Sequence, residues 1–317
     1  MIPQHYFQVI CCPKCKSNLD QNIENDKELI CLACKSTYPV IEGIPVLLPI
    51  LDDEVSQVVK CFYDSEWKRN KDGVLKGKIT HEDLSNLGQL YTKRNEARFV
   101  SLFGQEQERD QKFFIDVGSG AQPRVEFGKN YSYHICLDFS LDGLIESRKL
   151  LGSRAICICG SILNMPIRDS MCDGLLASHV IYHIAKDLQV SAIKQLTRVL
   201  RPGGKMIILY SNPNSLEKLL IKGLKNVMRR NKTDVSDQST FYSYAHSINS
   251  ILDILLNECG NSSVDVKFLR MFSNRITGPL YNNSFLGPVG FMLIATVEKL
   301  LKGIPRIATY VSYIAMK

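Results

Sequence analysis

Residues 113–121 read Phe113-Phe114-Ile115-Asp116-Val117-Gly118-Ser119-Gly120-Ala121, and this stretch decides the fold. A short, mostly apolar strand runs directly into a turn that contains two glycines. Such a turn, followed by a helix, is typical of nucleotide-binding domains, because glycine lets a ligand approach the backbone closely. The third glycine of a full G-x-G-x-x-G pattern is missing, since Pro123 stands there. This difference argues against a dinucleotide-dependent dehydrogenase.

The segments that follow alternate between strand and helix patterns. Residues 134–138 form a second predicted strand that ends on Asp138, an acid placed to accept hydrogen bonds from two ribose hydroxyls. Further strands are expected near residues 155–159, 173–178, 206–210, 264–272 and 309–316. We expect a helix from about residue 179 to residue 200, then a tight turn over residues 201–205. This order predicts an α/β fold with a doubly wound, mainly parallel sheet.

Residues 112–211 resemble the class I S-adenosylmethionine-dependent methyltransferases. Four motifs carry the likeness: Asp116-Val117-Gly118-Ser119-Gly120, Asp138, Asn164-Met165-Pro166 with Asp173, and Leu200-Arg201-Pro202-Gly203-Gly204-Lys205. The resemblance implies a Rossmann-like, seven-stranded sheet and S-adenosyl-L-methionine as cofactor. The residues that it places at the cofactor are Asp116, Gly118, Ser119, Gly120, Asp138, Phe139, Ser161, Ile162 and Ser178. One departure concerns adenine, because Ser161 stands where the family usually has an aspartate.

Four cysteines near the N-terminus predict a structural zinc site. Cys12, Cys15, Cys31 and Cys34 form two C-x2-C pairs, and fifteen residues separate the pairs. Two such turns give four thiolates, which close a tetrahedral shell around Zn²⁺ and leave no open position for catalysis. Cys11 is an alternative to Cys12, but Pro13 favours Cys12 as the ligand. Two disulfides are the other alternative, which a reducing compartment disfavours.

The same N-terminal segment resembles the small zinc-ribbon domain of methyltransferase activator proteins. Cys-Pro-Lys-Cys, Cys-Leu-Ala-Cys and the run Tyr-Pro-Val-Ile-Glu-Gly-Ile-Pro-Val-Leu-Leu at residues 38–48 carry this likeness. We therefore expect a zinc-ribbon domain at residues 1–51 and a methyltransferase domain at residues 52–317. The second domain divides into a helical cap or connector (52–110), a cofactor-binding core (111–211), and insertions with the last strands (212–317). Tyr63 and Trp67 lie in the connector, either as lid aromatics or, in the favoured interpretation, packed against the core.

The acceptor of the methyl group is expected beyond the fourth strand of the core. His179, Tyr182 and His183 follow that strand and are the candidate catalytic residues. A neutral histidine there could take a proton from a hydroxyl. His179 and His183 are four residues apart and would share a helix face. The alternative is that these histidines only cap or pack near the cofactor. The other cysteines, Cys61, Cys136, Cys157, Cys159, Cys172 and Cys259, are interpreted as core residues.

Two segments of the last third suggest contacts beyond the cofactor. Residues 215–230 combine an apolar and a basic helical face, which suits packing on the domain itself, an anionic substrate or a membrane surface. The insertion at residues 275–305 is rich in apolar residues, which suggests a lid, a dimer contact or contact with a lipid-linked substrate. Residues 285–301 within it could also make peripheral membrane contact. The sequence does not determine an oligomeric state.

Composition limits the partners further. The chain has 317 residues, 11 cysteines and a net charge of +7, which permits but does not require an anionic macromolecule. Residues 1–10 lack a secretory signal pattern and no apolar run reaches membrane-spanning length, so we expect a cytoplasmic protein. The expected function is methyl transfer to oxygen or nitrogen of a small molecule, glycoconjugate or natural-product intermediate. The alternatives are methylation of an rRNA or tRNA base, and a non-catalytic zinc-ribbon scaffold.

Overall fold

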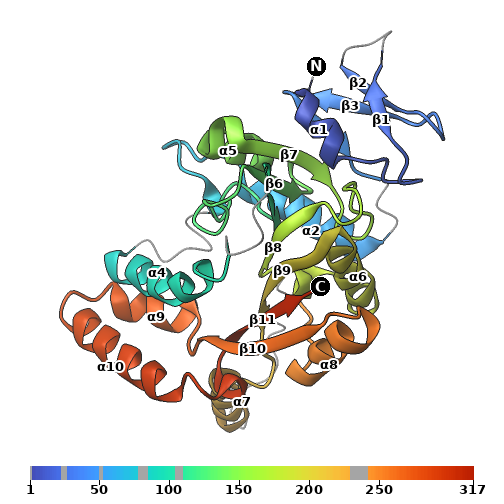
Figure 1. Cartoon of the computed structure of the whole chain (residues 1–317). Helices are drawn as coiled ribbons and strands as arrows, with labels where there is room; N and C mark the ends of the chain where they lie inside the picture. Colours follow the sequence, from blue (N-terminus) through green and yellow to red (C-terminus); the bar gives the residue numbers. More distant parts are fainter. Residues whose placement is uncertain (1, 23–26, 50–52, 78–84, 104–109, 229–241) are drawn as a thin grey trace.

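The computed structural model describes residues 2–22, 27–49, 53–77, 85–103, 110–228 and 242–317. Its centre is a twisted sheet whose strands run in the order β7-β6-β5-β8-β9-β11-β10 (Figure 1). The first five of these strands are mutually parallel, and β11 joins β9 and β10 antiparallel. Their bounds are Phe113–Val117 (β5), Tyr133–Asp138 (β6), Ala155–Gly160 (β7), Cys172–Ser178 (β8), Leu200–Ser211 (β9), Ser263–Arg270 (β10) and Tyr310–Met316 (β11). The expected seven-stranded methyltransferase sheet is confirmed.

Helices cover both faces of this sheet, because its strands are apolar on both sides. Ile115 and Val117 of β5 pack in a core with α6 and α8, whereas Phe114 faces a second core with α4. The helix bounds are Glu54–Glu66 (α2), Asn86–Val100 (α4), Leu141–Leu151 (α5), Gln189–Val199 (α6), Leu216–Met228 (α7), Ile248–Asp253 (α8), Asn274–Tyr281 (α9) and Leu286–Leu301 (α10). Short helical turns lie at Gly152–Arg154, Ile181–His183, Lys186–Leu188, Ile254–Glu258 and Pro305–Ile307. Among the helices of the described segments, none is long and apolar enough to cross a bilayer.

The N-terminal ribbon extends the sheet instead of standing apart from it. It consists of α1 (Gln4–Val9), β1 (Leu19–Gln21), β2 (Glu28–Cys31), β3 (Thr37–Ile41) and β4 (Ile44–Leu47). β4 pairs parallel with β7, Val46 opposite Cys159 and Leu47 opposite Gly160. Among the described residues, eleven strands therefore form one continuous sheet (Figure 1). This pairing covers a sheet edge that would otherwise expose its backbone groups.

Side chains of α1 hold the ribbon against the catalytic core. The buried hydroxyl of Tyr6 accepts a hydrogen bond from the Cys157 amide at 3.0 Å. Ile10 forms an isolated bridge with Ile167, and the Arg168 amide donates to the Val9 carbonyl at 2.9 Å. Val9 and Ile10 are fully buried in the same core as β5 and β8. The ribbon thus shares the hydrophobic core of the domain that follows it.

The interpretation of residues 179–184 as the start of a long helix is wrong. His179 has a left-handed backbone (φ 59°), and its amide donates to the Leu209 carbonyl at 3.0 Å. Two short helical turns, Ile181–His183 and Lys186–Leu188, follow, and α6 begins at Gln189. His179 and His183 therefore do not share a helix face.

Two further expectations need correction. The expected turn at residues 201–205 lies inside β9 as a bulge, since Cys172 pairs with Leu200 while Gly174 pairs with Lys205. The bulge brings Arg201 to the buried Asp173, with 2.6 Å between Nε and Oδ1. Cys61 is not a core residue, because it lies exposed on α2.

Candidate active site and metal centre

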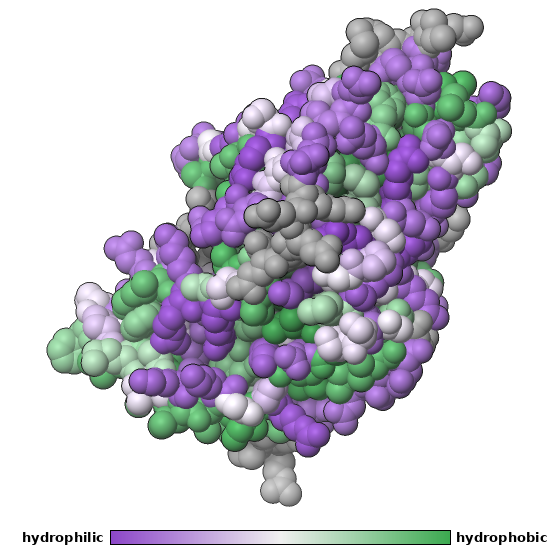
Figure 2. Space-filling model, viewed as in Figure 1, coloured by the Kyte–Doolittle hydropathy of each residue, from purple (hydrophilic) through white to green (hydrophobic). Residues whose placement is uncertain are grey.

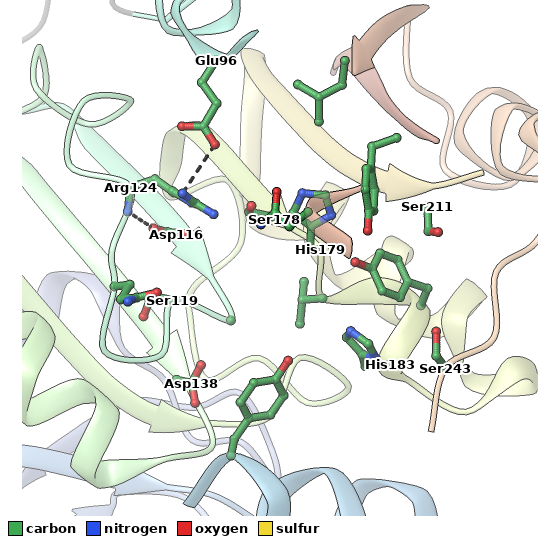
Figure 3. A pocket seen from close by; sticks show the side chains of 18 of the residues that line it. Glu96, Asp116, Ser119, Arg124, Asp138, Ser178, His179, His183, Ser211 and Ser243 are labelled. Carbon is green, nitrogen blue, oxygen red and sulfur yellow. Dashed lines mark hydrogen bonds and ion pairs between the residues drawn. The ribbon is translucent and has the colours of Figure 1, made fainter. Parts of the chain in front are cut away.

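A cavity of about 1,350 Å³ opens at the edge of the sheet where the parallel strands end. Its wall includes the segments that follow β5, β6, β7 and β8, together with residues of α2, α4, α7 and α9. The carboxyl ends of parallel strands are the usual binding edge of such sheets. Figure 3 shows Asp116, Ser119, Asp138, Ser178 and His179 around this space.

The glycine-rich turn lies between a strand end and an aromatic side chain. Gly118 and Gly120 both have positive φ angles, 71° and 53°. A Cβ atom on Gly118 would lie 2.6 Å from Val180, so the turn has room only for glycine. Trp67 packs over Gly120 and is almost fully buried. Tyr63 stacks on the Trp67 ring with 5.9 Å between centroids, and both residues line the cavity.

The acid at the end of β6 is held in place by backbone amides. Asp138 accepts hydrogen bonds from the amides of Gly120 and Ser140, each at 2.8 Å. Burial raises the pKa of this carboxyl to about 6, although the two amides oppose the shift. A ligand that donates hydrogen bonds to the carboxylate would stabilise its charged form. Such a donor pair is what the ribose of a nucleoside provides.

The third loop of the cofactor side begins at the end of β7. The buried Ser161 hydroxyl accepts a hydrogen bond from the Leu163 amide at 3.2 Å, so it also shapes the loop. Ser161, Ile162 and Phe139 all line the cavity. The structure thus brings together around the cavity the residues that the sequence predicts at the cofactor. Gly120 is the one that does not line the cavity, because it lies beneath Trp67.

Several buried polar atoms on this wall have no hydrogen-bond partner among the described residues. They are Ser119 Oγ, Ser178 Oγ, His179 Nδ1 and Trp67 Nε1. Buried polar groups in folded proteins are nearly always paired, so a group of orphans around one cavity indicates a ligand. With Asp138 and the glycine turn beside them, these atoms fit S-adenosylmethionine.

His179 stands between the cofactor side and the rest of the cavity. Its ring packs edge-to-face on Tyr310 with 4.8 Å between centroids. The pKa of His179 is held well below its ordinary value by burial, with smaller contributions from Arg270, Arg124 and His183. The imidazole is therefore neutral near pH 7, and one ring nitrogen is available to accept a proton.

Tyr182 and His183 also reach the cavity but are more constrained. Burial raises the pKa of Tyr182 well above its ordinary value, so its hydroxyl remains protonated. His183 places Nδ1 3.0 Å from the Tyr242 carbonyl. Nδ1 therefore carries the proton in the neutral tautomer. Figure 3 shows His183 farther from Asp138 and Ser119 than from Ser243.

Sequence reasoning missed Arg270 and Tyr310 on the far wall of the cavity, although it gave an anionic substrate as one use of the basic face of residues 215–230. Arg270 at the end of β10 lies over the Tyr310 ring, 4.7 Å from its centroid, so Arg270, Tyr310 and His179 form one stack. Antiparallel pairing aligns Tyr310 with Ser211 of β9. The start of β11 therefore lies at the same edge as the carboxyl ends of the parallel strands. The antiparallel direction of β11 is the feature from which Tyr310 could have been predicted to line the cavity.

Cationic side chains line the cavity at several places. They are Lys93, Arg124, Lys218, Lys222, Arg270 and Arg275, of which Arg124 lies beside Asp116 on the cofactor side (Figure 3). Arg124 pairs with Glu96 at 3.4 Å (Figure 3). The buried Glu217 accepts hydrogen bonds from the amide and hydroxyl of Ser273 and from the hydroxyl of Thr309. The cavity wall also contains the acids Glu96, Asp116, Glu126 and Asp138.

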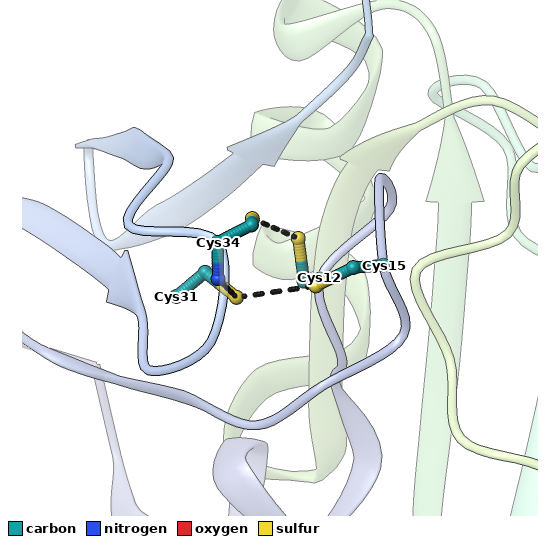
Figure 4. Close-up of side chains that lie close together, drawn as sticks. All are labelled: Cys12, Cys15, Cys31 and Cys34. Atoms are coloured by element: carbon teal, nitrogen blue, oxygen red, sulfur yellow. Dashed lines mark hydrogen bonds between the residues drawn. The ribbon is translucent and has the colours of Figure 1, made fainter.

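A separate centre lies in the ribbon, where four thiols converge. The Sγ atoms of Cys12, Cys15, Cys31 and Cys34 lie within 4.8 Å of one another (Figure 4). Cys12 and Cys34 are 3.7 Å apart, and Cys15 and Cys31 are 3.4 Å apart. A tetrahedral zinc with Zn–S bonds of about 2.3 Å separates its sulfurs by about 3.8 Å. The set therefore fits a closed structural zinc site, and Cys11 is not part of it.

The two halves of this centre have the same backbone geometry. The Lys16 and Lys35 amides donate to the Cys12 and Cys31 carbonyls, and both lysines have φ 61°. Each loop is closed by a second bond, from the Cys12 amide to Ser17 and from the Cys31 amide to Ser36. Two equal turns that face each other explain why the spacing of the cysteines was sufficient to predict the site.

Comparison with known families agrees with both centres. Residues 115–208 match the model described as "Methyltransferase domain", and residues 7–43 match the model described as "Trm112p-like protein". The chain is a methyltransferase-domain protein with a Trm112p-like zinc ribbon. The part of the chain that binds the cofactor is an S-adenosylmethionine-dependent methyltransferase domain.

Relatives of this methyltransferase-domain protein match it in parts. An uncharacterized protein of Methanocaldococcus jannaschii is 30% identical over 120 residues, 38% of this chain and 50% of that protein. The probable tRNA methyltransferase 9B of Homo sapiens is 38% identical over 110 residues, 34% of this chain and 23% of that protein. A UPF0434 protein of Shewanella frigidimarina is 49% identical over 42 residues, 13% of this chain and 71% of that protein. The chain spans half or less of the length of the first curated relatives that it matches.

A solved structure supports the fold of the methyltransferase-domain protein. The [4+2]-cyclase SpnF aligns with a TM-score of 0.52 at 15% identity, covering 87% of this chain and 99% of that one. At this identity the likeness concerns the fold alone.

Proposed function

We propose that the protein transfers a methyl group from S-adenosylmethionine to an oxygen or nitrogen of a small-molecule or glycoconjugate acceptor. The observation that carries this proposal is the continuity of one cavity from the Asp138 side to the Arg270–Tyr310–His179 stack. Such a cavity has room for a cofactor and an acceptor side by side. Concave pockets are the usual binding sites of small molecules, which favours a compact acceptor.

On the cofactor side, we assign each residue a role that its position supports. Asp138 holds the ribose, the Gly118–Gly120 turn approaches the amino-acid portion, and Ser161 with Ile162 borders the adenine. The cofactor, when bound, supplies an electrophilic methyl group. Trp67 and Tyr63 close this side against water. Positioning of this kind supplies much of the rate enhancement in a displacement reaction.

On the acceptor side, His179 is the candidate general base. A hydroxyl or amine must lose a proton as it accepts a methyl group, and His179 is neutral, buried and next to the cofactor side. Tyr310 fixes the imidazole ring by its edge-to-face contact. His183 is a positioning residue in this scheme, because its Nδ1 lies 3.0 Å from the Tyr242 carbonyl. Tyr182, whose ring packs edge-to-face on His183, is assigned the same role.

The charges of the far wall specify the acceptor further. Arg270, Lys218 and Arg275 line the acceptor half of the cavity, whereas Glu217 is occupied by Ser273 and Thr309. Lys218 is half-buried, its Nζ donates to the Ser211 hydroxyl at 2.8 Å, and burial lowers its pKa. We therefore expect an acceptor that carries a phosphate, sulfate or carboxylate group.

Calorimetry and methyl-transfer assays test this proposal. Wild-type protein should bind S-adenosylmethionine, and Asp138→Ala should lose at least about tenfold in affinity. Tritiated cofactor is then offered with phosphorylated sugars and their neutral counterparts. Arg275→Gln should raise KM for the anionic acceptors only, with Lys194→Gln on α6 as the control. Equal cofactor binding by wild type and Asp138→Ala would refute the proposed site.

A second candidate is methylation of an RNA base. It is favoured by relatives whose names describe tRNA methyltransferases. The same cationic wall would then contact the phosphate backbone. Transfer of label to bulk tRNA, together with a steep loss of binding as salt rises, would support this candidate over the first.

A further inference from the structure

The outer face of α10 is mainly apolar, with Thr296 and Lys299 as its exposed polar residues. Large hydrophobic side chains stand exposed at helical spacing: Phe285, Leu286, Val289, Met292, Leu293 and Leu300. Figure 2 shows hydrophobic side chains at the lower left, where α10 lies in Figure 1, with hydrophilic ones between them. Several large apolar side chains exposed on one helix of a folded protein often mark an interaction site.

The inner face of α10 packs against the rest of the domain, so only its outer face is available for a partner. Ile294 packs with Tyr91 of α4 and Tyr281 of α9. Glu298 accepts hydrogen bonds from the Tyr91 hydroxyl and the Met271 amide and pairs with Arg94. These contacts fix the rotation of the helix about its axis. The helix therefore presents its apolar outer side as a rigid surface.

The first turns of α7 add a second apolar strip. Leu216, Leu219 and Leu220 are exposed there, while Glu217 points inward to Ser273 and Thr309. α7 and α10 both lie along the lower margin of the molecule in Figure 1.

The charges around these strips have one sign. Residues 211–222 and 271–310 contain two acids, Glu217 and Glu298, and both are buried. The cations of these two segments that stand exposed are Lys222, Arg275, Lys299, Lys302 and Arg306. The surface formed by the exposed residues of α7, α9, α10 and residues 302–307, here called the α7–α10 face, is thus apolar and positive, with no exposed acid in the described part.

We propose that the α7–α10 face docks on an anionic lipid bilayer. Apolar side chains at the centre of an amphipathic helix enter the boundary between headgroups and acyl chains, and the cations beside them attract anionic headgroups. This charge pattern favours an anionic bilayer over the other possible partners of the face. A second copy of the chain would bring equal positive charges together, and an RNA would leave the exposed leucine, valine and phenylalanine side chains without a partner.

Vesicle flotation tests the proposal without reference to catalysis. The full chain is mixed with vesicles of phosphatidylcholine containing 30% phosphatidylglycerol, or with phosphatidylcholine alone. We expect flotation with the anionic vesicles, at least about tenfold weaker binding to neutral ones, and a marked loss in high salt. A Lys299→Glu/Lys302→Glu variant should bind as weakly as wild type binds neutral vesicles.

A matched pair of variants separates the face from general surface effects. Leu293 on α10 and Leu150 on α5 are both 64% exposed. Leu293→Asp should lose vesicle binding at least about tenfold, and Leu150→Asp should bind like wild type. Circular dichroism and melting temperature confirm that both variants are folded. Equal flotation of the two variants would overturn the proposal. It would also be overturned if Leu293→Asp only lowered the mass in light scattering, which indicates self-association, or only abolished tRNA binding.

Discussion

Trp67 lies directly on Gly120: a Cβ atom at residue 120 would stand 2.3 Å from Cζ2 of the indole. The connector before the core therefore contributes one wall of the cofactor turn. We expect Gly120→Ala to push Trp67 away and to weaken binding of S-adenosylmethionine by about tenfold or more, measured by calorimetry.

The control for this variant is Gly203→Ala. Gly203 also has a positive φ angle (75°), but a Cβ atom there would meet nothing within 4 Å. Both variants should lose about 1 kcal/mol of stability from backbone strain. Only Gly120→Ala should change cofactor affinity, and an equal effect of both would mean that Trp67 plays no part.

The raised pKa of Asp138 predicts that the stability of the cofactor-free protein falls with pH while its affinity for the cofactor rises. Its pKa rises from 3.8 to about 6 in the folded protein. Between pH 3.8 and 6 the folded protein therefore keeps a proton on Asp138 that the unfolded chain releases. The stability that this proton gives to the cofactor-free protein is lost as pH rises through 6. Cofactor affinity should instead increase with pH through the same range, because ribose hydroxyls donate to the ionised form. Calorimetry and melting curves between pH 5 and 7.5 measure both slopes, and Asp138→Asn should flatten them.

His179 predicts activity that persists in mild acid. Because burial holds its pKa well below 6.5, the imidazole stays neutral as pH falls past that value, and the acid limb of kcat should lie below pH 6.5. His179→Gln should lower kcat by about 10²–10⁴-fold while cofactor affinity stays unchanged. His183→Gln should alter KM more than kcat. Full turnover by His179→Gln would remove this residue from the mechanism.

Removal of the metal should affect the cofactor site as well as the ribbon. The Cys11 amide, next to the ligand Cys12, donates to the Pro166 carbonyl at 3.0 Å, and Lys16 Nζ donates to the Met165 carbonyl at 3.1 Å. These contacts link the zinc site to the loop after Ser161. A strong chelator or Cys34→Ser should lower the melting temperature and weaken cofactor binding, with zinc content measured by mass spectrometry. Cys61→Ser, at an exposed cysteine on α2, should do neither.

The cofactor side was predictable because its signals are local. Asp116, the glycine turn and Asp138 each follow from a strand end, and the four zinc-binding cysteines follow from two short repeats. The acceptor wall was predictable only in part. The basic face of residues 215–230 suggested an anionic substrate, but Arg270 and Tyr310 come from distant segments that only the sheet order brings together. His179 misled the prediction because its left-handed backbone interrupts an apparently helical pattern.

The pairing of β4 with β7 across the ribbon boundary could not be predicted from the sequence either. The β4 segment reads as half of a small hairpin with β3, and that pairing is present. Nothing in Val46 or Leu47 indicates a second, parallel partner in β7. Such a contact depends on the placement of α1 and on the Tyr6–Cys157 hydrogen bond, which are tertiary features.

Because β4 and β7 belong to one polypeptide, their pairing does not depend on protein concentration. A ribbon supplied by a separate subunit would dissociate on dilution and would have to be synthesised in matching amounts. The linked ribbon has instead an effective concentration of about millimolar or more at its docking edge. The catalytic sheet is therefore always capped in a one-to-one ratio, and another protein could occupy the β7 edge only by displacing a tethered competitor.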